Sequence, residues 1–283
     1  MTTAQLSAPV PQRPPGEAAT CVFAVRRCPD RGSLAAVPGH TGGGPLSMLP
    51  LDEGLWAVTQ EVPAAEFTED ALRSRLADQR QLEESARTHH AVVTAASADG
   101  PVVPLPLATL FTDPHRAQAA LNDQRPRFLA ALDRLTGRTE WAVKVYLRQR
   151  GEGRGEAPAS STSTAEASGQ AYLKRVRDRD QQCRARQDAA LNAARHVHDV
   201  AAGYAVASVQ RRPHGPEITG RDRTQTLNAA YLVDDAQAPR LVAAMRALGH
   251  APSEAEVEVS GPWVPYSFAE APDAAPGAGG IGV

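Results

Sequence analysis

A run of small and polar residues near the middle of the chain limits what it can fold into. Residues 149–169 read QRGEGRGEAPASSTSTAEASG and show no apolar periodicity. Such a Gly-, Ser-, Thr- and Ala-rich composition is typical of a flexible linker, because it offers little apolar surface to bury. We therefore predict a flexible linker at 149–169 between an N-terminal domain, 20–148, and a C-terminal α+β domain, 170–262.

The two ends of the chain have different compositions. Residues 1–19 are rich in proline and poor in apolar side chains, so they cannot offset the entropy lost on ordering, and we predict a disordered tail. Residues 263–283 begin with aromatic side chains and end in Ala, Gly and Pro. We predict an aromatic docking segment there, followed by a frayed tail.

Composition narrows the class of protein. The 283 residues carry 30 Lys and Arg against 32 Asp and Glu, a net charge of −2, which favours neither nucleic acid nor a membrane as a partner. The apolar runs are too short to span a bilayer, the first residues lack the pattern of a secretory signal, and three cysteines are too few for a disulfide scaffold. We expect a soluble cytoplasmic protein.

Apolar periodicity in the N-terminal domain predicts strands and helices in the order β-β-α-β-α-β. The strands are expected at 20–26, 54–62, 102–111 and 141–147, the helices at 69–98 and 113–136, and a long Gly/Pro-rich loop at 27–54. Pro104 and Pro106 mark the third strand as a sheet edge, and Pro126 is expected to interrupt the second helix. This order favours a ferredoxin-like α/β sandwich.

The C-terminal domain is expected to be a second α/β sandwich. Its pattern predicts a long polar helix at 170–202, strands at 204–210, 224–233 and 254–261, and a short helix at 234–249. The predicted fold class is therefore α+β, with two α/β sandwich domains, the first ferredoxin-like, joined by a flexible linker.

No group of residues in the sequence matches a known catalytic, cofactor or metal motif. Phosphate-binding loops, HExxH and the nucleophile elbow are absent, and His196 and His198 on one helix point about 200° apart. His89 fits either a hydrogen-bonded core imidazole or a proton-transfer role. Cys183 fits a buried structural thiol or, if it is exposed, a thiol activated by the neighbouring Arg184 and Arg186. We expect no cofactor, no metal and no enzyme; a hydrolase would need converging histidine and carboxylate groups.

A cluster of cations lies in the predicted long helix. Its members are Lys174, Arg175, Arg177, Arg179, Arg184 and Arg186, against Asp178 and Asp180. A solvated helix face with ion pairs between neighbouring turns explains such a cluster. A docking face for an acidic protein is the alternative, and nucleic acid is disfavoured because no aromatic side chains lie between the charges.

The segment GPWVPYSF, residues 261–268, concentrates aromatic side chains between prolines. Prolines prevent a helix here and stiffen an extended chain, so little entropy is lost when the segment docks into a groove. Trp263, Tyr266 and Phe268 either pack on their own domain or present aromatic anchors to another protein.

Several stretches, in order along the chain, resemble the gas vesicle protein GvpL/GvpF family. GPWVPYSF resembles the family's Gly-Pro-Trp-x-Pro-Tyr-Ser-Phe motif, and TEWAVKVYL resembles its Glu-Trp-x-x-Lys strand, with Glu140, Trp141 and Lys144 in register. The other stretches are GLWAVTQEVPAAEF, HHAVV, VVPLPLATLF and GQAYL. In VVPLPLATLF, Pro106 replaces the usual arginine and Ala108 the usual glycine.

The resemblance implies a function in gas vesicles. Family members are accessory or minor proteins of these gas-filled shells, so the chain is expected in the cytoplasm and at the vesicle. The implied partners are the hydrophobic shell protein GvpA and other accessory proteins, bound in a chaperone-like or nucleating role. Expected contact surfaces are the edge at Val102–Leu107 and the arginine-rich helix face. The alternative is a regulatory or scaffolding module no longer linked to vesicle formation.

Overall fold

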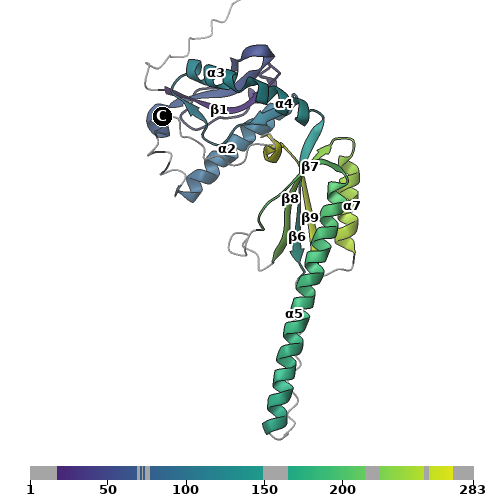
Figure 1. Ribbon diagram of the computed structural model, residues 1–283. Helices are drawn as coiled ribbons and strands as arrows, with labels where there is room; N and C mark the ends of the chain where they lie inside the picture. The colour runs from purple at the N-terminus through teal and green to yellow at the C-terminus, as the bar shows by residue number, and fades with distance from the viewer. Residues whose placement is uncertain are drawn as a thin grey trace, which may run out of the picture. The chain divides into compact units, whose positions relative to one another are not determined.

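The structure is a computed structural model that describes residues 18–68, 71, 73, 77–148, 165–213, 224–251 and 255–269. Its chain divides into two compact units (Figure 1). The first unit runs to Thr136 and also contains the segment that starts at Val264. The second unit runs from Gly137 to Trp263.

The first unit is built on an antiparallel sheet whose strand order is β2-β3-β1-β4, with β5 also paired to β1. Its strands are β1 (Ala18–Arg26), β2 (Leu46–Pro50), β3 (Trp56–Pro63), β4 (Val102–Pro104) and β5 (Leu110–Phe111). Every residue from Thr20 to Arg26 is buried. Both faces of the central strand are therefore covered.

Helices cover the two faces of this sheet. They are α2 (Gln79–Ser97), α3 (Pro114–Asp123) and α4 (Arg125–Leu135), with α2 on one face and the other two on the opposite face (Figure 1). The Asp78 carboxylate accepts hydrogen bonds from the first backbone N–H groups of α2, and Asp113 accepts one at the start of α3. These caps satisfy donors that a helix start leaves without partners inside the helix.

Three details of the first unit differ from the predictions. Strand β2 lies inside the loop predicted at 27–54. The helix predicted at 69–98 is interrupted at Asp78: Ala71, Arg73 and Ala77 are helical, and α2 begins at Gln79. The strand predicted at 102–111 is interrupted between β4 and β5, where Ala108 has a φ of 63°. β4 does form one end of the sheet, as the prolines predicted, and the helix break before Pro126 is confirmed by the gap between α3 and α4.

The second unit has the order β-α-β-β-α-β. Its elements are β6 (Arg138–Leu147), α5 (Ala165–Ala202), β7 (Ala205–Gln210), β8 (Gln225–Asp234), α7 (Ala238–His250) and β9 (Ala255–Trp263). All pairs are antiparallel, in the spatial order β7-β8-β6-β9. This element order is that of the ferredoxin-like motif. The strand predicted at 141–147 as the last of the first domain is thus the first strand of the second sheet.

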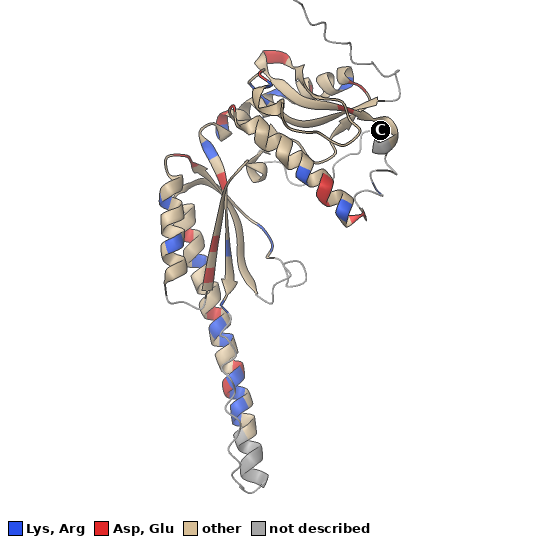
Figure 2. Ribbon diagram, turned by 180° about the vertical axis from the view of Figure 1, so that it is seen from behind, with Lys and Arg blue, Asp and Glu red and all other residues tan. Residues whose placement is uncertain are grey.

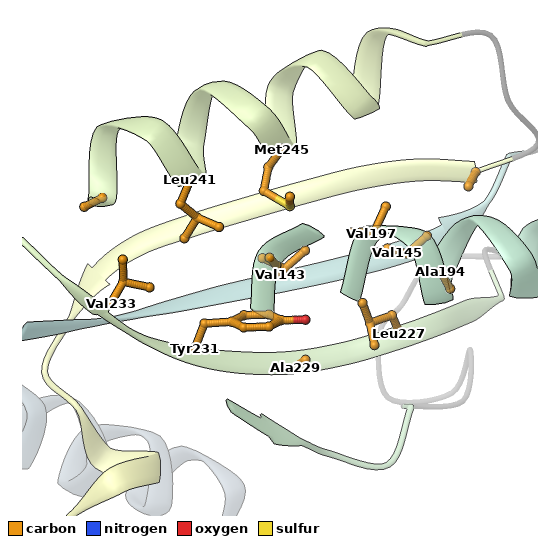
Figure 3. Packing of buried hydrophobic residues seen from close by; sticks show 13 residues of the cluster. Val143, Val145, Ala194, Val197, Leu227, Ala229, Tyr231, Val233, Leu241 and Met245 are labelled. Atoms are coloured by element: carbon orange, nitrogen blue, oxygen red, sulfur yellow. The ribbon is translucent and has the colours of Figure 1, made fainter. Parts of the chain in front are cut away.

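The core of the second unit lies between this sheet and its two helices (Figure 3). Val143 and Tyr231 come from the sheet, Val197 from α5, and Leu241 and Met245 from α7. The Tyr231 hydroxyl lies 2.7 Å from Nδ1 of His198 on α5. This hydrogen bond satisfies a phenol whose pKa is raised mainly by burial.

The predicted tails and linker fall largely outside the described residues. Ala18 and Ala19, the last two residues of the predicted N-terminal tail, belong to β1, so the prediction of disorder is wrong for them, and 1–17 and 270–283 are not described. Of the predicted linker, 149–164 is not described, while Ala165–Gly169 belong to α5. Among the described helices, none is long and apolar enough to cross a bilayer.

Candidate protein-binding surfaces

The predicted cation cluster lies on the half of α5 that extends past the end of its sheet (Figure 1). Every described side chain from Tyr172 to Ala185 is exposed, and Figure 2 shows Lys and Arg along this stretch. Arg186, the last cation of the cluster, is half-buried and donates a hydrogen bond to the Arg148 carbonyl, 2.8 Å away. The cations therefore lie where a partner can reach them.

The same half of α5 exposes apolar side chains. Tyr172, Leu173 and Val176 are 63%, 57% and 39% exposed. Cys183 is also exposed, so the prediction of a buried thiol at this position is wrong. The reason is geometric: the apolar stripe of α5 continues past the sheet that buries its C-terminal half.

The aromatic segment 261–268 divides between the two units. Trp263 ends β9 in the second unit and is 45% exposed. Val264 belongs to the core of the first unit, and the Phe268 carbonyl accepts a hydrogen bond from Arg134. Phe268 is only 5% exposed, so of the three predicted aromatic anchors it is the one a partner cannot reach in this structure.

Tyr266 has a packing role in the first unit. Its ring lies 6.0 Å from the His90 ring, and its hydroxyl is 3.4 Å from His90 Nδ1. Burial raises the pKa of Tyr266 to about 12. For Tyr266 and Phe268 the contacts therefore favour packing on their own unit, whereas Trp263 still presents an exposed aromatic surface.

An apolar groove of about 480 Å³ lies beside Trp141 in the second unit. Its walls include Pro262 from the end of β9 and Pro239 and Val242 from α7, with Arg246 also lining it. The pairing of Glu140 with Trp263 places the Glu-Trp strand and the Gly-Pro-Trp segment side by side. The sequence did not predict this groove, although both stretches that build it were singled out.

The cation cluster and this groove lie toward opposite ends of β6. Arg186 contacts the chain just after β6, at Arg148, whereas Trp263 pairs with Glu140 near its start. From Arg186 the cluster extends away from the sheet (Figure 2). The second unit therefore has two separate candidate surfaces.

The edge strands β4 of the first sheet and β7 of the second sheet differ in the exposure of their side chains. The edge predicted for strand addition, at β4, has buried side chains at Val102, Val103 and Pro104. β7, an edge of the second sheet, instead leaves Val206 and Val209 47% and 37% exposed. An open edge strand is a site where another strand can pair, so β7 suits strand addition better than β4.

His89 is buried in the first unit. Its ring lies 5.6 Å from that of Phe23, which also stacks on His40 at 5.4 Å. Burial, with a smaller contribution from His40, lowers the pKa of His89 to about 4. The aromatic surroundings favour a core imidazole, but among the described residues neither ring nitrogen of His89 has a hydrogen-bond partner of ordinary geometry, so the predicted hydrogen-bonded form is not found. Within the described residues, no three His, Cys, Asp or Glu side chains gather as a metal site would require.

The comparisons with known proteins agree on one family. The family model described as "Gas vesicle synthesis protein GvpL/GvpF" matches residues 19–270. The chain is 39% identical over 253 residues to "Gas vesicle protein L" of Streptomyces sp. (strain CB03234), covering 88% of this chain and 91% of that protein. The chain therefore belongs to the GvpL/GvpF family, which supports a gas vesicle related role.

Solved structures of the family show a similar fold. The crystal structure of the gas vesicle protein GvpF from Anabaena sp. PCC7120 matches with a TM-score of 0.62 at 14% identity, over 90% of this chain and 97% of that one. GvpF from Microcystis aeruginosa matches with a TM-score of 0.58 at 15% identity, over 89% and 99%. At such low identity these matches establish the fold, mixed helix and sheet with two antiparallel sheets.

Proposed function

We propose that the chain is an accessory protein of gas vesicle assembly that binds the hydrophobic shell protein GvpA and other accessory proteins. In this proposal it works in the cytoplasm and at the growing vesicle, by contact rather than by catalysis. A shell subunit with an apolar gas-facing surface aggregates unless a partner covers it. Covering that surface until the subunit joins the shell is the chaperone-like step.

Family membership over residues 19–270 is the observation that carries the proposal. The exposed surface of the second unit supports it, because this unit presents accessible apolar side chains on different elements. They are Tyr172, Leu173, Leu191, Val206, Val209 and Trp263. Exposed apolar side chains close to charged ones are typical of surfaces that bind other proteins.

Co-expression with the shell protein tests the proposal. The full chain, carrying an affinity tag, is produced together with GvpA, and GvpA is measured in the soluble fraction and in the purified complex. We expect a larger soluble fraction and co-purification. If GvpA stays insoluble and does not co-purify, direct binding is wrong.

A matched pair of variants makes the test specific. Val209→Ser removes an exposed apolar side chain on the open strand β7, whereas Ser208→Ala changes the neighbouring exposed residue without adding polarity. We expect Val209→Ser to reduce co-purification more than Ser208→Ala if β7 contacts the shell protein. Equal yields from both would exclude β7 as the contact, leaving the other exposed surfaces.

A further inference from the structure

The apolar stripe of α5 has the spacing of a coiled-coil seam. Counting alternately three and four residues from Leu173 gives the positions 173, 176, 180, 183, 187, 190, 194, 197 and 201; of these, Asp180 and Gln187 are polar and the other seven are apolar. The last four are Ala190, Ala194, Val197 and Ala201, all buried, and Ala194, Val197 and Ala201 lie in the core of the second unit. The seam therefore faces the sheet at its C-terminal end.

Toward the N-terminus of α5 the sheet no longer covers the seam. Leu173, Val176 and Cys183 lie on it and are exposed, and Figure 1 shows this half of α5 extending past the strands. In the C-terminal half the sheet covers the seam. In the N-terminal half the seam is open to an apolar partner with the same spacing.

Four of the five positions that border this open seam are arginine, and the fifth, next to Leu173, is Tyr172. In a heptad whose core positions are 173, 176, 180 and 183, the flanking arginines are Arg177, Arg179, Arg184 and Arg186. Arg177, Arg179 and Arg184 are exposed. In paired helices, residues at these positions set partner choice through ion pairs across the interface. Arginine on both borders selects acidic side chains in the partner.

We propose that the exposed half of α5 pairs with an acidic amphipathic helix of another protein. Leu173, Val176 and Cys183 form the apolar part of the seam, with Asp180 between them. The exposed bordering residues Arg177, Arg179 and Arg184 meet Glu or Asp on the partner. This inference deepens the proposed function by naming the chemistry of a partner. It rests on that function only in that the chain works by binding other proteins.

The arginines and the apolar seam together disfavour two other binding partners, a second copy of this chain and nucleic acid. Pairing with α5 of a second copy would bring arginine borders against each other, which like-charge repulsion opposes. Nucleic acid would not need an apolar seam between the arginines, and no aromatic side chain on this stretch lies between the charges. A helix that is apolar on one face and acidic on its borders satisfies both features at once.

Designed peptides test the proposal without any shell-protein sequence. Three helices of about four heptads share a leucine seam and carry Glu, Gln or Lys at every bordering position. Binding of each labelled peptide to the full chain is measured by fluorescence anisotropy. We expect the Glu peptide to bind about tenfold more tightly than the Gln peptide, and the Lys peptide not at all. This preference should weaken between about 50 and 300 mM NaCl.

Two matched double variants distinguish the effect of the bordering arginines from the effect of the helix's overall positive charge. Arg177→Glu/Arg184→Glu reverses two bordering charges, and Lys174→Glu/Arg175→Glu reverses two charges outside the borders of the same helix. We expect the first variant to lose the Glu peptide and gain the Lys peptide, and the second to keep the original preference. Circular dichroism checks that both variants retain the helix content of the unaltered chain.

Four results would overturn the proposal. The first is equal affinity of the chain for the Glu and Gln peptides, and the second is an equal loss of Glu-peptide binding in the two double variants. The third is a dimer of the chain in sedimentation that the double variant Leu173→Ser/Val176→Ser dissociates. The fourth is tighter binding of the chain to a single-stranded RNA of about 20 nucleotides, or to anionic vesicles, than to the Glu peptide. Because the peptides are unrelated to GvpA, failure here leaves the co-expression result standing. Failure of that result likewise leaves the helix proposal standing.

Discussion

Gly261 lies directly against the Trp141 indole. A Cβ atom on this glycine would lie 2.8 Å from Cε3 of Trp141 and 3.0 Å from the Glu140 carbonyl oxygen. Its φ of 149° is also a conformation that side chains with a Cβ rarely adopt. Both constraints fix glycine where β9 meets β6 beside the groove.

Gly261→Ala should therefore destabilise the protein by about 2–4 kcal/mol, because it adds a steric clash to backbone strain. Chemical denaturation measures the loss. Gly100→Ala is the matched control: Gly100 has a φ of 137°, but its Cβ would meet no described atom within 4 Å. A loss as large for Gly100→Ala would show that the contact with Trp141 adds nothing.

Ala108 occupies the left-handed region, with a φ of 63°, in the turn between β4 and β5. A Cβ in this conformation costs about 1 kcal/mol, a cost that glycine avoids. Because glycine also adds about 0.5–1 kcal/mol of freedom to the unfolded chain, we expect Ala108→Gly to leave the stability unchanged or to raise it by up to about 0.5 kcal/mol in thermal or chemical unfolding. Any change in the unfolding midpoint should appear in the transition of the first unit, which contains this turn.

Ala98→Gly serves as the control for Ala108→Gly. Ala98 follows α2 with an ordinary helical φ of −64°, so glycine there only adds freedom to the unfolded chain. It should destabilise by about 0.5–1 kcal/mol. The strain argument fails if both glycine variants lower the stability.

Acid should destabilise the first unit through His89. Its folded pKa of about 4 lies below the ordinary value of 6.5, so between these values the unfolded chain binds more protons. The contribution of His89 to stability is therefore complete above pH 6.5 and is lost as the pH falls toward 4, by about 3 kcal/mol in total. Urea unfolding at a series of pH values measures it.

A neutral residue of similar size should remove this dependence. His89→Leu is expected to flatten the stability curve between pH 6.5 and 4, whereas His115→Gln, at an exposed position at the start of α3, should leave it unchanged. An identical acid loss in His89→Leu would assign the effect to other groups.

Trp263 and Phe268 should respond differently to truncation. Trp263 is 45% exposed and Phe268 is 5% exposed, so Phe268→Ala should cost about 3–4 kcal/mol of stability. Trp263→Ala should cost less than about 1 kcal/mol and, if Trp263 is a contact, reduce GvpA co-purification. Thermal unfolding and the pull-down measure the two effects. Equal destabilisation by both would make Trp263 a packing residue.

The sequence predicted the positions of strands and helices better than it predicted which sheet each strand joins. The apolar alternation of 141–147 identified a strand, but alternation reflects one covered face and not which sheet pairs with it. That strand pairs with β8 and β9, so its contacts depend on residues about 80 to 120 positions later. The ferredoxin-like order was consequently expected in the first domain and occurs in the second unit.

Two other incorrect predictions, the loop at 27–54 and the buried Cys183, have local causes. Leu46–Pro50 lies between prolines and glycines, so it was predicted as loop, yet it pairs with β3 along its whole length. On α5 the helical period identified the stripe, and the exposure of the cations agrees with the prediction. Where the covering sheet stops could not be seen from the period alone, which is why Cys183 was expected to be buried.

Cell-free synthesis of the shell protein tests the central claim most directly. GvpA is translated in the presence of increasing amounts of the purified full chain, and its soluble fraction is measured after ultracentrifugation. Binding and covering of the apolar shell subunit predicts a soluble fraction that rises with dose and saturates at a fixed molar ratio. A soluble fraction that stays the same at every dose would contradict the claim.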